Sequence, residues 1–307
     1  MRIVIIGLGS IGSNHLKLLV KNYNHDLLIY RSGKTRSKNK YNVRETYSWR
    51  DIKGFNPEVV FICNPTNLHI STAIKCAKLG YKLFIEKPID SNTKNLKFIL
   101  KLVKIKKIVS YIAYNLRFHP IIIDIKKIVK TKKPIHCRIS CTSDIKNWRN
   151  NSLFKKSYSL KKKSGGGVLL DLSHEIDYID YIFDGIKSIN GLHYKLSNIT
   201  IDSEDCADLI IKTKKCIVNL HLNFISKIKE RSIKIDFKNF SIETDLNTGK
   251  FIKHYSNKIS SKKYIISKEK VYLNQLDYFF SNINNNKMTN NLEEASVLFY
   301  KLIKYKR

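Results

Sequence analysis

The chain has 307 residues, 43% of them apolar, which is long enough for two domains with separate cores and too apolar for a disordered protein. Lysine and arginine outnumber aspartate and glutamate by 57 to 25, giving a formal net charge of +32. The excess is mostly lysine spread along the chain, without a basic stripe of interleaved aromatic residues, so we expect no specific nucleic-acid partner.

Other global features indicate a cytoplasmic protein. No apolar run approaches the ~20 residues that a membrane span needs, so we expect no membrane partner. The first residues are predicted to form a core strand, so we expect no signal peptide. The cysteines lack C-x-x-C or zinc spacing, so we expect reduced thiols and no metal site. They are Cys63, Cys76, Cys137, Cys141, Cys206 and Cys216.

The first dozen residues predict a dinucleotide-binding turn. Ile3 to Ile6 is an unbroken apolar run, typical of a strand buried on both faces of a parallel sheet. G-x-G-x-x-G follows it directly, and the amphipathic segment from Ser13 to Asn22 supplies a helix whose N-terminus can receive a pyrophosphate. The residues predicted to bind the cofactor here are Gly7, Gly9, Ser10, Ile11 and Gly12.

The second predicted strand, Asp26 to Tyr30, bears on the choice of cofactor. NAD-specific domains place an aspartate or glutamate at its end, whereas this chain has Arg31 and Ser32. A guanidinium and a hydroxyl there suit a 2′-phosphate, so the sequence favours NADP(H), with NAD(H) possible. The alternative is an ordinary solvated basic loop.

Three further predicted strands complete a first domain. They run from Pro57 to Asn64, from Lys82 to Ile85 and from Lys107 to Ala113, with helices predicted near 68–79 and 92–103. This alternation predicts an α/β fold, a doubly wound parallel Rossmann sheet over residues 1–117. The carboxyl ends of such strands border the ligand crevice, and polar residues follow each one.

Beyond residue 117 the pattern predicts an α+β domain over 118–307. A helix near 120–130 and a strand near 135–144 precede a helical stretch from Val168 to Phe183. Alternating segments then predict a large, mostly antiparallel open sheet, and two amphipathic helices close the chain. The predicted strands of this sheet lie near 186–194, 207–212, 217–226, 232–237 and 240–243, and the helices near 270–282 and 292–304.

An ordered set of motifs resembles one enzyme family. G-L-G-S-I-G, N-P-T-N-L-H, E-K-P, Y-N-L-R-F-H-P and G-G-G-V-L-L-D-L-S-H-E-I-D together are similar to the Gfo/Idh/MocA oxidoreductases, named after glucose–fructose oxidoreductase, inositol dehydrogenase and a rhizopine catabolism protein. The resemblance covers nearly the whole chain. It implies a substrate that is a sugar, a cyclitol or a sugar derivative, bound beside the nicotinamide, and an open sheet that mediates a homodimer or homotetramer.

The resemblance also implies roles for individual residues. Glu86 would orient the nicotinamide or its ribose, and Lys87 would face the substrate hydroxyl ahead of a Lys87–Pro88 peptide that is often cis in the family. Residues implied at the ribose and nicotinamide end are Asn64, Pro65, Asn67 and His69. Those implied at the substrate are Lys87, Asn115, Arg117, Asp171, His174 and Asp177.

The chemistry gives these residue types a reason. Oxidising a carbinol requires a base for the hydroxyl proton, and the imidazole of His174, with an ordinary pKa of ~6.5, suits that exchange. Lys87 can stabilise the developing alkoxide or act as the base. On a helix, His174 shares one face with Asp171 and with Asp177. Family members commonly place the histidine four residues after the aspartate, and here the spacing from Asp171 is three.

We therefore predict an NAD(P)-dependent oxidoreductase that transfers a hydride at a CH–OH carbon of a sugar-type substrate, which the wording of the motifs associates with surface-glycan pathways. Lys87 and His174 are the predicted catalytic residues. Two alternatives stay open for single positions, because His174 could be a helix-surface histidine and Arg117 a surface ion-pair partner. The alternative function is a non-catalytic dinucleotide-binding sensor of the same fold.

Overall fold

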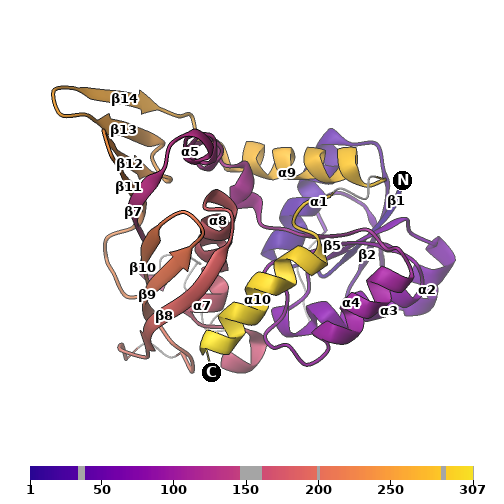
Figure 1. The fold of residues 1–307 in the computed structure, drawn as a ribbon. Helices are drawn as coiled ribbons and strands as arrows, with labels where there is room; N and C mark the ends of the chain where they lie inside the picture. The colour runs from indigo at the N-terminus through magenta and orange to yellow at the C-terminus, as the bar shows by residue number, and fades with distance from the viewer. Residues whose placement is uncertain (34–38, 146–160, 199–200, 285–287, 307) are drawn as a thin grey trace. The chain divides into compact units, whose positions relative to one another are not determined.

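The structure is a computed structural model that describes residues 1–33, 39–145, 161–198, 201–284 and 288–306 (Figure 1). The chain divides into two compact units. The first consists of Met1–Ala113 and Leu276–Val297, and the second of Tyr114–Gln275 and Leu298–Arg307. The predicted boundary was at residue 117, with all later residues in the second domain. In the structure, residues 276–297 belong to the first unit.

The first unit is built on a six-stranded sheet in the order β3-β2-β1-β4-β5-β6, in which every neighbouring pair is parallel. This is the strand order of a doubly wound dinucleotide-binding domain, and it confirms the predicted fold class. The strands are β1 (Arg2–Ile6), β2 (Asp26–Tyr30), β3 (Arg44–Thr46), β4 (Val59–Ile62), β5 (Lys82–Ile85) and β6 (Ser110–Ile112).

Helices cover both faces of this sheet, with α1 on one side and the neighbouring pair α3 and α4 on the other (Figure 1). The apolar strands are buried because both faces are covered; Val59 to Ile62 is buried at every position. The helices of this unit are α1 (Ser10–Asn22), α2 (Trp49–Phe55), α3 (His69–Lys78) and α4 (Leu96–Ile105), with a 3₁₀ turn η1 (Thr66–Leu68).

The segment Leu276–Val297 adds aromatic side chains to the core of the first unit. Phe279, from helix α9 (Lys268–Asn282), is fully buried, with its ring 5.1 Å from that of Phe84 and 5.8 Å from that of Tyr111 in edge-on or tilted contacts. Large aromatic rings bury the most apolar area per residue. The segment therefore belongs to the core of the first unit although it lies more than 160 positions after Ala113 in the sequence.

The second unit is built on an eight-stranded sheet in the order β14-β13-β12-β11-β7-β10-β9-β8. Its neighbouring pairs are antiparallel except β10 with β7, which confirms the predicted mostly antiparallel sheet. The strands are β7 (Pro134–Thr142), β8 (Ile186–Tyr194), β9 (Cys206–Thr213), β10 (Ile217–Asn223), β11 (Glu230–Phe237), β12 (Ser241–Asp245), β13 (Lys250–His254) and β14 (Ile259–Lys263).

Within the described part of this unit, helices α5, α7 and α8 lie against one face of the sheet (Figure 1). The helical stretch predicted over 168–183 is interrupted, because Leu172 (φ −92°, ψ 24°) separates α7 from α8. Asp171 and His174 consequently do not share one continuous helix, which corrects the expectation that they share a face. The remaining elements are the 3₁₀ turns η2 (Asn115–Phe118) and η5 (Lys162–Ser164), and the helices α5 (Pro120–Thr131), α7 (Val168–Asp171), α8 (Ser173–Ile182) and α10 (Leu292–Lys306).

Two global features complete the description. All six cysteines are free thiols, five of them buried. Among the described residues, no helix combines the length and the apolar character that crossing a bilayer requires.

Candidate functional site

The glycine turn after β1 fits the pyrophosphate of a dinucleotide. Gly7 has φ +95°, and a Cβ there would lie 2.8 Å from the Cys63 carbonyl oxygen. A Cβ on Gly12 would lie 2.0 Å from the Gly7 carbonyl oxygen, so only glycine lets α1 pack this closely on the strand. At Gly9, by contrast, a Cβ would meet nothing within 4 Å.

Gly9 therefore has no packing reason to be glycine among the described residues, and the open space beside it is what a ligand approaching the backbone needs. Gly9 is also the N-cap of α1, with no side-chain cap, so the first-turn amides of Ser10 and Ile11 can face an anion. Two glycines build the turn, and the third leaves room for the ligand.

Arg31, which follows β2, is not part of a solvated loop. The Arg31 side chain is buried, and its Nη1 donates to Glu45 Oε2 (3.0 Å). The backbone N–H of Arg31 donates to the Thr46 carbonyl (2.9 Å). Glu45 is paired with Ile29 across β3 and β2. Ser32, which follows, is exposed. The guanidinium predicted to bind a 2′-phosphate is thus held by a carboxylate in this structure.

After β4, the N-P-T-N-L-H segment forms an ordered turn. Asn64 Nδ2 donates to Thr72 Oγ1 (2.8 Å), while Pro65 and Asn67 are exposed. His69 is buried, with Nδ1 2.8 Å from the Pro88 carbonyl oxygen and Nε2 2.9 Å from the Asn64 carbonyl oxygen. Burial lowers the pKa of His69, and the two carbonyls oppose that shift. His69 ties the ends of β4 and β5 together, and the exposed residues of the turn are available to a ligand.

After β5, Lys87 is the one accessible side chain in a buried run. All of residues 83–90 are described, and all except half-buried Lys87 are buried. The Lys87–Pro88 peptide is cis, as the resemblance implied. The buried Glu86 carboxylate accepts from Lys87 N (3.3 Å) and lies 2.7 Å, through Oε1, from His15 Nε2. Lys87 is therefore presented at a strand end whose preceding residue is fixed from the core.

The second unit shows the same pattern around His174. All of residues 165–179 are described as buried except His174, which is half-buried. Its ring meets that of Tyr114 edge-on, with centroids 5.6 Å apart. Burial, and secondarily the carboxylate of Asp177, raises the pKa of Tyr114, which keeps its phenol protonated. His174 is thus the accessible titratable group in a stretch that is otherwise buried.

Two more predicted residues, Arg117 and Asp177, form a buried ion pair. Arg117 donates through Nε and Nη2 to the two oxygens of Asp177, at 2.9 and 2.7 Å, in a bidentate pair. Both partners are largely buried, and burial raises the pKa of Asp177 while Arg117 opposes that rise. The guanidinium also lies over the Tyr181 ring. Arg117 is therefore not an exposed surface partner, and both oxygens of Asp177 are occupied by Arg117.

Asn115 and Asp171, also predicted at the substrate, are both buried. Asn115 opens the 3₁₀ turn that carries Arg117, and Asp171 ends α7, with its backbone N–H bonded to the Gly167 carbonyl (3.0 Å).

The triple glycine before α7 has a structural role that the sequence did not reveal. Gly167 has φ +105°, and a Cβ there would lie 2.4 Å from Glu204 Oε1. Glu204 accepts from the Leu169 amide (3.3 Å) at the start of α7 and pairs with Lys306 Nζ (2.5 Å) near the end of α10. The glycine makes room for a carboxylate that favours the helix start electrostatically.

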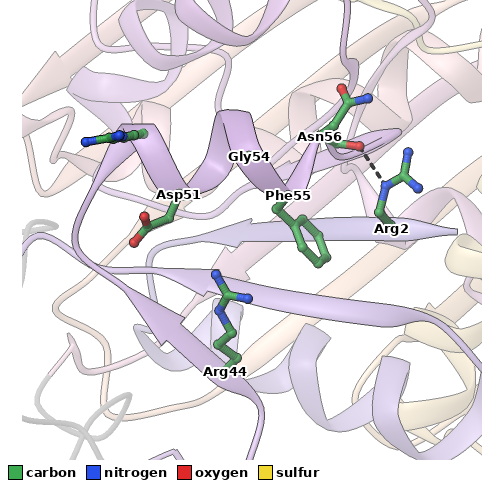
Figure 2. Close-up of a pocket in the computed structure, with 7 residues that line it drawn as sticks. Arg2, Arg44, Asp51, Gly54, Phe55 and Asn56 are labelled. Atoms are coloured by element: carbon green, nitrogen blue, oxygen red, sulfur yellow. Dashed lines mark hydrogen bonds between the residues drawn. The ribbon is translucent and has the colours of Figure 1, made fainter.

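Two other features of the surface are separate from these residues. A hollow of about 630 Å³ is lined by Arg2, Arg44, Arg50 and Asp51 together with Phe55 and Asn56 (Figure 2). Arg2 and Arg44 are the first residues of β1 and β3. The hollow therefore lies at the amino ends of the strands, whereas doubly wound sheets bind ligands at the carboxyl ends.

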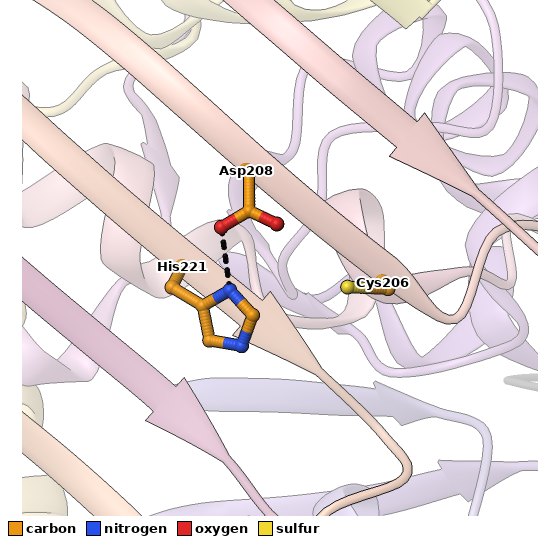
Figure 3. A group of neighbouring side chains, drawn as sticks. All are labelled: Cys206, Asp208 and His221. Carbon is orange, nitrogen blue, oxygen red and sulfur yellow. Dashed lines mark hydrogen bonds and ion pairs between the residues drawn. The ribbon is translucent and has the colours of Figure 1, made fainter. Parts of the chain in front are cut away.

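The other feature is a cluster of Cys206, Asp208 and His221 on β9 and β10, whose ligand atoms lie within 4.8 Å of one another (Figure 3). Asp208 Oδ1 lies 2.6 Å from His221 Nδ1, and Asn223 Nδ2 lies 2.8 Å from His221 Nε2. The Asn223 amide is oriented, because its oxygen accepts from the Ser226 amide (2.9 Å). Both ring nitrogens are thus engaged by protein groups, which matches a hydrogen-bonded surface cluster.

Four residues beside the predicted site were missed: His15, Glu45, Tyr114 and Glu204. A signal was present for His15, which lies three positions after Gly12 on the inner face of the predicted helix. No local pattern distinguishes Glu45 or Glu204, because each acts through a partner far away in the sequence or in a separate element.

Comparisons with known proteins agree with this geometry. Residues 1–114 match the model of the GFO_IDH_MocA family, described as an oxidoreductase family with an NAD-binding Rossmann fold. The chain is 28% identical over 197 residues to myo-inositol 2-dehydrogenase of Thermotoga maritima, covering 59% of this chain and 54% of the relative. It is 24% identical to scyllo-inositol 2-dehydrogenase (NAD(+)) of Bacillus subtilis, covering 64% and 58%. These matches span about half the length of the curated relatives.

Solved structures match over the whole chain in fold. A levoglucosan dehydrogenase in complex with NADH superposes with a TM-score of 0.86 at 17% identity, covering 100% of this chain and 96% of the other. UDP-N-acetylglucosamine 3-dehydrogenase from Acidithiobacillus ferrooxidans has a TM-score of 0.81 at 15% identity, with the same coverage. The match of residues 1–114 and the inositol dehydrogenase relatives support a Gfo/Idh/MocA-type oxidoreductase, and the solved structures show that the whole chain shares their fold.

Proposed function

We propose that this chain is an NAD(P)-dependent dehydrogenase or reductase acting on a CH–OH group of a sugar, a cyclitol or a sugar derivative. One observation supports it above the others. Lys87 and His174 are each the accessible side chain of an otherwise buried run that the structure fully describes. Exposing one titratable group from a rigid, buried frame is how proteins fix a reactive residue in place.

The first unit would hold the dinucleotide. The open backbone at Gly9 and the uncapped start of α1 fit its pyrophosphate, and the exposed Pro65 and Asn67 follow a strand end on the same edge of the sheet. When bound, the nicotinamide accepts or supplies the hydride. The finer preference for NADP(H) over NAD(H) depends on Arg31, since a 2′-phosphate would need the guanidinium that Glu45 now holds.

The two catalytic residues would divide the work on the hydroxyl group. In the oxidative direction the hydrogen leaves the carbinol carbon as hydride, with the electron pair of the C–H bond. The hydroxyl oxygen on the same carbon must lose its proton. We assign that proton to His174 and the stabilisation of the alkoxide to the ammonium of Lys87. In the reverse direction His174 returns the proton to the oxygen.

The remaining predicted residues would orient these groups and the substrate. Arg117 and Asn115 would bind substrate hydroxyls or an anionic substituent, and Asp177 would act mainly by holding Arg117 in its bidentate geometry. The net charge of +32 suits an anionic substrate such as a phosphorylated or nucleotide-linked sugar, including a surface-glycan precursor.

We also propose that the chain forms a homo-oligomer through the open face of the eight-stranded sheet. That face has a hollow of about 820 Å³ and carries the exposed apolar side chains of Leu192 and Ile210. Exposed apolar surface on a sheet is typical of a protein–protein contact. Sedimentation of the wild type beside Ile210→Lys tests this, because the charge should dissociate the oligomer and leave the fold intact.

Turnover of a panel of sugars, cyclitols and nucleotide sugars, followed by nicotinamide absorbance, tests the enzymatic function. Lys87→Ala and His174→Ala should each lower kcat at least about 100-fold, the scale of a lost proton-transfer group, while dinucleotide affinity stays within about threefold. The matched control is Lys82→Ala, a half-buried lysine at the start of β5, the strand that Lys87 follows. Unchanged kcat in both active-site variants would overturn the assignment.

A further inference from the structure

The Arg31–Glu45 pair combines the two kinds of residue that normally distinguish the two dinucleotides. Domains that bind NAD use an acidic residue near the end of the second strand for the ribose hydroxyls, and those that bind NADP use an arginine for the 2′-phosphate. Here Arg31 directly follows β2, and Glu45 lies on the adjacent strand β3, in register with Ile29. Arg31 Nη1 contacts both oxygens of Glu45, at 3.0 and 3.3 Å.

The pair is shielded from solvent, so its charges are weakly screened. The Arg31 side chain is 7% exposed and that of Glu45 is 21% exposed. A buried arginine is retained only with a partner, and here the carboxylate supplies it. The net charge of the pair is zero, so Arg31 does not by itself offer a positive site to a phosphate.

From this arrangement we infer that Glu45 is a specificity-determining residue, which lowers the affinity for NADP(H) relative to NAD(H) by occupying Arg31. This inference rests on the proposed function, because it concerns how the same cofactor site discriminates. A 2′-phosphate would replace the carboxylate on the guanidinium and would leave the Glu45 carboxylate beside it, a close contact between like charges. A 2′-hydroxyl, being neutral, would meet no such opposition.

Glu45→Gln tests the inference, because it removes the charge and keeps the shape. We expect NADPH to bind at least about tenfold more tightly to this variant than to the wild type, with NADH changed by less than about threefold, as read from the fluorescence of each nicotinamide in direct titrations. The gain should shrink as salt concentration rises, since it arises from charge. The readout is binding alone, so no substrate is needed.

Glu58→Gln is the matched control. Glu58 belongs to the same unit, is exposed, and accepts from the backbone N–H of Arg2 (3.1 Å), so this variant makes the same change in net charge without touching Arg31. It should leave the ratio of the two affinities unchanged. Arg31→Gln adds a second control: in that background Glu45→Gln should no longer favour NADPH.

The possible results separate the inference from the proposed function. If wild type, Glu45→Gln and Glu58→Gln all bind neither dinucleotide, the proposed function itself fails. If the wild type binds dinucleotide but Glu45→Gln leaves the NADPH-to-NADH affinity ratio within about twofold of the wild type, the role of Glu45 is overturned and the oxidoreductase function stands. Thermal unfolding of Glu45→Gln confirms that the compared proteins are folded. Should it unfold, Glu45→Asp, which retracts the carboxylate by one methylene group, should shift the ratio in the same direction.

Discussion

His15 Nε2 lies 2.7 Å from Glu86 Oε1, and both side chains are buried. His15 belongs to the helix that begins at the glycine turn, and Glu86 immediately precedes Lys87 at the end of β5. The imidazole meets the rings of Phe61 and Phe84 edge-on, and these two rings stack on each other. This contact joins the helix proposed to receive the pyrophosphate to the strand end that carries the proposed catalytic lysine.

The first prediction concerns the stability of this contact. His15→Leu should lower the free energy of unfolding by about 3 kcal/mol, because it removes the side-chain partner of the buried Glu86 carboxylate. The double variant His15→Leu/Glu86→Leu should lose at least about 1 kcal/mol less than the sum of the two single variants. Urea unfolding measures all four proteins. If the losses in the two single variants simply added up in the double variant, the His15–Glu86 contact would contribute no specific interaction energy to stability.

The second prediction separates the roles of two glycines. Gly12→Ala should destabilise the protein by about 1–3 kcal/mol, since its Cβ would meet the Gly7 carbonyl oxygen at 2.0 Å. Gly9→Ala should change stability by less than about 1 kcal/mol but weaken dinucleotide binding at least about tenfold, because its methyl group fills the space beside the backbone. Thermal unfolding and fluorescence titration on the same samples check both halves. If Gly9→Ala bound the dinucleotide as tightly as the wild type, the glycine turn would not be part of the cofactor site.

The third prediction concerns pH. His119 caps α5, where Nδ1 accepts from the Ile121 amide (3.3 Å) and Nε2 donates to the Leu246 carbonyl (3.2 Å), and burial lowers its pKa to about 4. In the unfolded chain the same group titrates near ~6.5. Between these values the unfolded state binds a proton that the folded state does not, so stability falls as pH falls through this window, by up to about 3 kcal/mol.

His119→Asn keeps a capping acceptor and does not titrate in this window. Its free energy of unfolding should therefore decline less than that of the wild type between about pH 6.5 and pH 4, as measured by urea unfolding across the range. Parallel pH profiles for the two proteins would show that His119 is not held neutral by the fold.

The fourth prediction tests the bidentate pair of Arg117 and Asp177. Asp177→Asn and Arg117→Lys should each cost about 3 kcal/mol, because asparagine loses the charge and lysine cannot form two parallel bonds. The double variant should be little worse than either single one, since each already breaks the pair. Chemical unfolding of the three variants checks this, with Arg138→Lys as the control, an exposed arginine paired with Asp236 at 3.3 Å. A loss in the control as large as in Arg117→Lys would contradict the special role of the buried pair.

Periodicity predicted most elements because their apolar residues face one core. The strand predicted over Ile186–Tyr194 has those bounds in the structure. Three strands at or next to sheet edges were missed: β3 has only three residues, β13 buries only Phe251, and β14 is exposed at every position. Residues 276–297 were assigned to the wrong side of the boundary for a related reason. Their apolar pattern predicts a helix and carries no information about which sheet the helix covers.

The site was predictable where a motif specifies local geometry, and not where partners meet through the fold. Gly7, Gly12 and the Lys87–Pro88 peptide adopt the conformations that their motifs implied. Arg31 was predicted to bind a 2′-phosphate, and no sequence rule connects it to Glu45, fourteen positions away on β3. The same limitation hid the engagement of Asp177 by Arg117, sixty positions earlier.

Hydride transfer itself is the most direct test of the account. The reduced dinucleotide, carrying deuterium at the transferable C4 position, is incubated with keto sugars and keto cyclitols, and the products are analysed by mass spectrometry. The wild type should place one deuterium on the new carbinol carbon of at least one substrate, and Lys87→Ala and His174→Ala should place little or none. If the wild type binds the dinucleotide tightly yet labels no product from any substrate, it is a dinucleotide sensor, and the proposed enzymatic function is wrong.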